Sequence, residues 1–151
     1  MSESIRVEDL QVFLHSITRY FEKITGHIAE AGLPFAKGDE EFLLDYTGII
    51  GVSGKYRGAV CFTADLDLLV ALLTCSGERD LRVTMAEDAV GEVANVIAGN
   101  ARSHFGPQFL ISVPVVVKGK PKSVNITSRN NNFVIPILWR KHRAYLLVGF
   151  E

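Results

Sequence analysis

An acid and an amide stand three residues apart in the middle of this chain. Glu92 and Asn95 would be surface neighbours on any helix formed there. A carboxylate can pair with a lysine, and a carboxamide can donate and accept hydrogen bonds at once, which is what orienting a hydrolytic water requires. The same pattern also occurs on helices that simply face solvent, so its meaning depends on the residues around it.

The helix that must position this pair has two different faces. Its polar stripe consists of Asp88, Glu92, Asn95, Gly99 and Arg102. Its apolar stripe consists of Ala86, Val90, Val93, Ile97 and Ala101. Thr84 and Glu87 have the spacing of a capping box, which predicts a helix start that leaves Asp88 in the first turn, and Gly106-Pro107 predicts the end.

Two glycines inside this helix allow two interpretations. Gly91 and Gly99 each cost roughly 1 kcal/mol relative to alanine, so the helix must gain something from their small size. They could admit another protein surface close to the helix, or they could allow tight packing against a sheet. Both interpretations are physically sound at this stage.

The rest of the sequence predicts an α+β fold, in which an antiparallel β-sheet packs against long α-helices. The expected helices are an amphipathic one over 7–24 that ends at Gly26 and a short apolar one over 65–75 with Asp65 as its cap. The expected strands are 42–52 and 58–63, which form a hairpin, then 110–117 and 123–127, and finally 133–139 and 144–150, which form a second hairpin.

The length, net charge and cysteine content of the chain limit the classes of protein to which it can belong. A length of 151 residues predicts a single domain over 1–151, and a net charge of −1 predicts no nucleic-acid or membrane partner. We expect a cytoplasmic protein, because neither a signal peptide nor an apolar run of roughly 18 residues is present. Cys61 and Cys75 form no CxxC pair and the histidines are scattered, so we expect neither a disulfide framework nor a bound metal, and we expect Cys61 to be buried.

The segment from Glu92 to Asn100 resembles the signature helix of the CheC/CheX/FliY chemotaxis phosphatases and is most similar to CheX. Asp88 precedes it, and the hairpin expected after Tyr46 and the helix over 7–24 fall where that family has its first hairpin and leading helix. The chain has only one E-x-x-N helix, as expected for a CheX-like single site. The downstream proline, Pro107 or Pro114, is nearer to Asn95 than in the family pattern, so neither is assigned a role.

The resemblance implies a CheC-like fold and a phosphatase that acts on the phosphoaspartate of a CheY-like response regulator. It implies that Glu92 docks by pairing with a regulator lysine and that Asn95 positions the attacking water. Asp88 becomes a supporting acid, and we expect Gly99 and Arg102 to face the partner. The chain itself would bind no cofactor, because the Mg²⁺ belongs to the regulator.

Two further expectations accompany this resemblance. It implies a homodimer formed through the sheet, for which the hairpin over 133–150 offers a candidate edge, although Pro136 would hinder pairing on one side. An alternative function is a module of the same fold that binds a regulator, or scaffolds another signalling protein, without chemistry.

Overall fold

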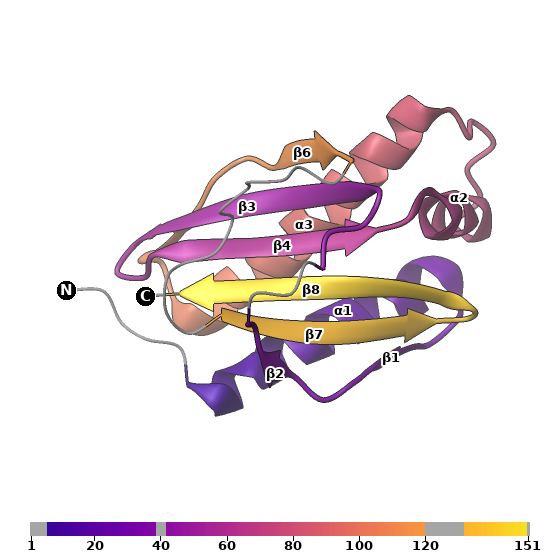
Figure 1. The fold of residues 1–151 in the computed structure, drawn as a ribbon. Helices are drawn as coiled ribbons and strands as arrows, with labels where there is room; N and C mark the ends of the chain where they lie inside the picture. The colour runs from indigo at the N-terminus through magenta and orange to yellow at the C-terminus, as the bar shows by residue number, and fades with distance from the viewer. Residues whose placement is uncertain (1–5, 39–41, 120–131, 151) are drawn as a thin grey trace.

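A computed structural model describes residues 6–38, 42–119 and 132–150 (Figure 1). These residues form one antiparallel sheet of eight strands in the order β1-β7-β8-β4-β3-β5, with β2 also paired to β7 and β6 also paired to β3. The strands are β1 (Ala29–Ala31), β2 (Phe35–Ala36), β3 (Tyr46–Gly54), β4 (Gly58–Ala64), β5 (Phe109–Ile111), β6 (Val115–Lys118), β7 (Asn132–Trp139) and β8 (His142–Phe150).

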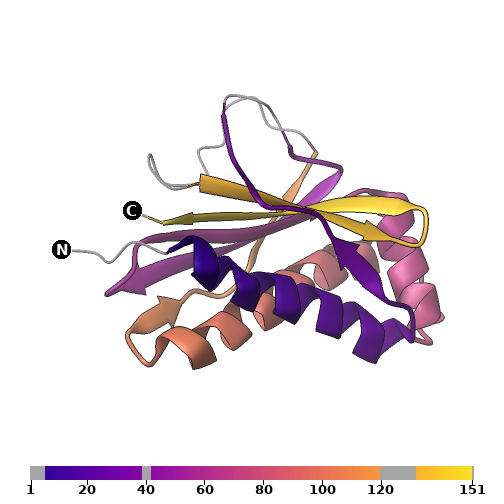
Figure 2. The same ribbon diagram turned by 90° about the horizontal axis from the view of Figure 1, so that it is seen from below.

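The described residues also form three α-helices: α1 (Leu10–Thr25), α2 (Leu66–Cys75) and α3 (Val83–Phe105). Figure 2 shows α1 and α3 side by side along the same face of the sheet, which confirms the expected α+β architecture. A 3-10 turn over Val7–Asp9 precedes α1, which ends as predicted at Gly26, where a φ of 77° suits a residue without a side chain. No helix among the described residues is long and apolar enough to cross a membrane.

The core fills the space between the sheet and the two long helices. Phe13 and Phe21 of α1 are fully buried there, and the ring of Phe21 lies 5.2 Å from that of Trp139 on β7. Helix α3 lies close to the sheet at Gly48 of β3, where an added Cβ would lie 2.5 Å from the carbonyl oxygen of Val90. The absence of a side chain at Gly48 therefore sets how near α3 can lie to the sheet.

The start of α2 differs in detail from the prediction. Asp65 occupies the N-cap position, but its side chain makes no capping hydrogen bond and instead accepts one from the backbone N–H of Asp45, at 3.3 Å. The carboxylate of Asp45 accepts the N–H of Leu66, at 2.9 Å. The cap of α2 therefore comes from a residue twenty positions earlier in the chain.

The strands depart from the prediction on both sides of the sheet. The first hairpin begins at Tyr46 rather than at residue 42, and the predicted strand over 110–117 is two strands, β5 and β6, separated at 112–114. The interruption is a bulge: Val52 pairs with Ile111 and Ile49 pairs with Val115, so residues 112–114 lie opposite only two residues of β3. The predicted strand over 123–127 lies outside the described residues.

The second hairpin is present as β7 and β8, but the expectation that it supplies a free edge is wrong. β8 pairs with β4, and the outer side of β7 is covered by β1 and β2, which the sequence did not predict. Pro136 falls in the gap between these two short strands, where its missing N–H is not needed, and its carbonyl accepts the N–H of Gly32 at 2.8 Å.

Candidate functional site

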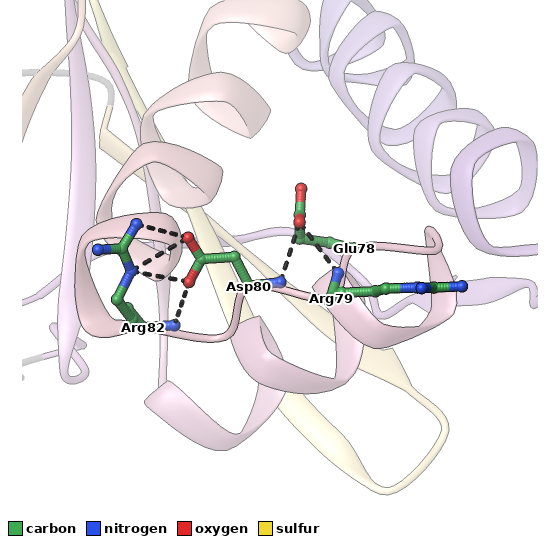
Figure 3. A network of polar contacts seen from close by, with 4 residues as sticks. All are labelled: Glu78, Arg79, Asp80 and Arg82. Atoms are coloured by element: carbon green, nitrogen blue, oxygen red, sulfur yellow. Dashed lines mark hydrogen bonds and ion pairs between the residues drawn. The ribbon is translucent and has the colours of Figure 1, made fainter.

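The helix that carries the predicted site begins differently from the capping-box expectation, which is wrong. α3 starts at Val83, its N-cap is Arg82, and no side chain caps it, so Asp88 lies in the second turn. Figure 3 shows the linker between α2 and α3, in which charged side chains make hydrogen bonds and an ion pair with neighbouring residues of the same segment. Arg82 Nη2 lies 2.6 Å from Asp80 Oδ2, and the same carboxylate accepts the backbone N–H of Arg82 at 3.2 Å.

The linker has a second hydrogen-bonded carboxylate just before this pair. Glu78 Oε1 accepts the N–H groups of Arg79 and Asp80, at 2.9 and 3.0 Å (Figure 3). Hydrogen bonds from Arg82, followed by its charge, hold the pKa of Asp80 below its ordinary value. The start of α3 is thus fixed by local polar contacts rather than by Thr84 or Glu87.

Beyond its first turn, α3 has the two faces that the sequence predicts. Every member of the apolar stripe is buried against the sheet and the other helices. On the other side the side chains of Asp88, Glu92, Asn95 and Arg102 are exposed. No described residue forms an ion pair with Asp88, Glu92 or Arg102, so these charges are available to a partner.

Glu92 and Asn95 lean toward different neighbours. At about 100° per residue, Asn95 lies about 60° around the helix from Glu92, on the side of Gly91, whereas Val96 and Asn100 lie on the opposite side. Glu92, Val96 and Asn100 face α1 and line a groove with it. Asn95 therefore lies between that groove and the 112–116 segment that covers Gly91.

The structure gives a different role to each of the two helix glycines, Gly91 and Gly99. An alanine methyl at Gly91 would lie 3.3 Å from Val116 Cγ2 and 3.6 Å from Pro114 Cβ, so Gly91 serves packing against the edge of the sheet. This contact also locates Pro114, one helical turn from Asn95. An added methyl at Gly99 would meet no heavy atom within 4 Å, so the space above Gly99 is open.

Helix α1 lies antiparallel beside α3 and is tied to it at two points. The side-chain amide of Asn100 donates to the Ser16 hydroxyl at 2.8 Å, and His104 Nε2 lies 3.5 Å from Asp9 Oδ1. Ser16 is buried, so the Asn100 bond satisfies a hydroxyl that would otherwise lack a partner. These contacts tie the C-terminal half of α3 to the first half of α1 and the turn before it.

Between α1 and α3 runs a groove of about 900 Å³. Its lining includes the apolar groups Val12, Tyr20 and Val96, the cations Arg19 and Lys23 from α1, and Glu92 from α3. Burial, and after it the nearby carboxylate of Glu92, raise the pKa of Tyr20, so that phenol stays neutral. Sequence reasoning missed the α1 residues because it used only the apolar period of that helix. Their signal was the spacing of four between the two cations Arg19 and Lys23.

The remaining candidates from the sequence are possible metal ligands and the two cysteines. Among residues 6–38, 42–119 and 132–150, no three His, Cys, Asp or Glu side chains are grouped as metal ligands would be. Cys61 is fully buried on the sheet, and this burial raises the pKa of its thiol to about 12. Cys75 is half-buried, and Arg140 Nη1 lies 3.3 Å from its sulfur.

The fold and the site define a class of α+β proteins. A single antiparallel sheet is covered by long helices, and one of these helices exposes an acid and an amide. The sequence model of the family described as chemotaxis phosphatase CheX matches residues 46–138. The chain therefore belongs to the CheX family of chemotaxis phosphatases. No curated protein sequence matches it.

Solved structures share this fold over nearly the whole chain. A chemotaxis protein from Desulfovibrio vulgaris Hildenborough is 24% identical with a TM-score of 0.84, and 100% of each chain is covered. CheX from Vibrio vulnificus is 27% identical with a TM-score of 0.82, covering 95% of this chain and 99% of the other. CheX from Borrelia burgdorferi, solved as a complex with CheY, BeF3 and Mg²⁺, is 18% identical with a TM-score of 0.77, covering 97% and 99%.

Proposed function

We propose that this chain hydrolyses the phosphoaspartate of a CheY-like response regulator, with Asn95 as its catalytic residue and Glu92 as its docking residue. The observation that carries the proposal is the exposure of both side chains on one face of α3, with no ion pair to Glu92 among the described residues. The CheX neighbour from Borrelia burgdorferi, solved with CheY, supports the choice of partner.

In the proposed reaction, water attacks the phosphorus of the regulator's acyl phosphate. The bond between phosphorus and the aspartate oxygen breaks, which releases inorganic phosphate and a free carboxylate. The carbonyl oxygen of Asn95 accepts a hydrogen bond from the water and aims its lone pair at phosphorus, so the contribution is positioning rather than proton transfer. The Mg²⁺ that the regulator holds neutralises phosphoryl charge, and no residue of this chain is assigned to it.

The second part of the proposal concerns docking, which is assigned to Glu92. Its carboxylate pairs with a lysine beside the regulator's phosphoaspartate, which places Asn95, about one helical turn away, over the phosphoryl group. Asp88 adds negative charge one turn earlier, Arg102 faces the partner farther along α3, and the open space at Gly99 allows the partner to approach between them.

Phosphate release from a phosphorylated regulator of the same cell tests the proposal. Asn95→Ala should remove at least about 10²-fold of the acceleration, while binding to the beryllofluoride-activated regulator persists. Glu92→Ala should weaken that binding by about tenfold or more, because it leaves a desolvated lysine unpaired.

Matched controls are available on surfaces away from α3's exposed face. Gln108→Ala removes an exposed amide after the helix end, and Glu30→Ala removes an exposed carboxylate on β1. Both should behave as the unmodified protein. If no cognate regulator loses phosphate faster in the presence of this chain, the activity is rejected. Binding without any acceleration would instead identify a non-catalytic module.

A further inference from the structure

The groove between α1 and α3 adjoins Glu92 but includes a wall that the proposed mechanism does not use. Arg19 and Lys23 are exposed, four residues apart on α1, and both line the groove. Neither forms an ion pair with any residue in the part of the chain that the structure describes. The groove therefore has a cationic wall on α1, an anionic group on α3 and an apolar floor between them.

The floor of the groove consists of side chains that are only partly covered. Val12, Tyr20 and Val96 are half-buried although they lie between two packed helices. Apolar surface of this kind gains free energy when another apolar surface covers it, which favours an amphipathic occupant over a small polar one.

We propose that this groove receives an amphipathic segment of the response regulator that presents a carboxylate to Arg19 and Lys23. The inference rests on the proposed function and names the regulator surface that the site would select. Exposed cations on α1 favour a partner surface that carries carboxylates, and the apolar floor favours apolar side chains beside them. The α1 wall complements such a surface, and it lies beside Glu92 within one groove.

The role assigned to Arg19 and Lys23 is specificity rather than catalysis. Charges at the rim of an interface steer association and reject partners of the wrong sign, while they leave the chemical step unchanged. Regulators that lack the acidic segment should therefore bind poorly even when they carry the lysine that pairs with Glu92.

The test is a charge reversal measured in two assays with the full chain. The double variant Arg19→Glu/Lys23→Glu should weaken binding to the beryllofluoride-activated regulator by about tenfold. It should raise KM for phosphorylated regulator by a similar factor while kcat stays within about twofold, and the difference in binding should shrink as salt is raised. The conservative variant Arg19→Lys should bind as the unmodified protein does.

Arg143→Glu is the matched control, because this exposed arginine alternates along β8 with Leu146 and Ala144 and so faces away from the helices. The proposal is overturned if the double variant binds as tightly as this control while Glu92→Ala does not, since the regulator would then dock through α3 alone. It is also overturned if the double variant abolishes self-association, because the groove would then hold a second copy. If the unmodified protein binds no activated regulator, the proposed function itself fails.

Discussion

Replacing Gly48 by alanine should push the site helix away from the sheet. The new Cβ would lie 2.5 Å from the Val90 carbonyl oxygen and 3.2 Å from the Ala94 Cβ. An ordinary contact begins near 3.4 Å, so the separation from the Val90 oxygen must grow by about 0.9 Å. The obstacle is the backbone of α3, which cannot rotate aside as the tip of a flexible side chain can.

Two opposing contributions to the free energy of unfolding determine how much Gly48→Ala destabilises the protein. Overpacking a core costs about 1–3 kcal/mol, and a backbone obstacle belongs at the upper end of that range. Alanine also restricts the unfolded chain, which stabilises the fold by about 0.4–1 kcal/mol. We expect Gly48→Ala to lower the free energy of unfolding by about 2 kcal/mol, which moves the urea midpoint by about 1 M.

Gly51→Ala on the same strand is the matched control. Its Cβ would lie 3.5 Å from the Ser112 hydroxyl oxygen, an ordinary contact, so this variant should unfold within about 0.5 kcal/mol of the unmodified protein or be more stable. Because the displaced helix carries Asn95, Gly48→Ala should also lose about 10²-fold of phosphatase activity if the proposed function holds. Equal urea midpoints for the two variants would refute the assignment of Gly48 as the residue that sets the helix-to-sheet distance.

Two other predictions concern the thiols and the oligomeric state. At pH 8 a thiol-reactive disulfide dye should titrate Cys75 alone in the folded protein, because burial raises the pKa of Cys61 to about 12 and keeps it neutral, and two fast-reacting thiols without denaturant would contradict this. Sedimentation should give a mass of about 33 kDa, twice the 16.6 kDa of one chain, because we propose a homodimer formed through the sheet, in which β5 and β6 are edge strands among the residues that the structure describes. A mass of 16.6 kDa at every concentration would reject the dimer.

Local patterns predicted the elements whose formation depends on near neighbours in the sequence. The helix around Glu92 was predictable because its apolar residues recur at the helical period, and α1 ended at Gly26 because a glycine there accepts a positive φ. The first hairpin followed from two β-rich runs around a short turn. The resemblance to the family was visible in the run from Glu92 to Asn100, together with Asp88 before it and the first hairpin after Tyr46.

Predictions failed where a distant residue decided the outcome. The strand over 110–117 divides because residues 112–114 lie opposite only two residues of β3, Ile50 and Gly51, which come much earlier in the chain. The free edge expected on the second hairpin is covered because β1 and β2 pair with β7 on either side of Pro136. Strand pairing is a long-range choice, so single-sequence periodicity can identify a strand without revealing its partner.

The sequence alone determined that a helix presents Glu92 and Asn95 on one face, because that requires only 3.6 residues per turn. Only the tertiary structure decided what flanks them. Packing placed Pro114 against Gly91, and it brought Arg19 and Lys23, more than sixty residues away, beside Glu92 in one groove. Two helices that bury their apolar faces on the same sheet lie side by side, so side chains on their adjoining flanks become neighbours. A local sequence pattern carries no information about that contact.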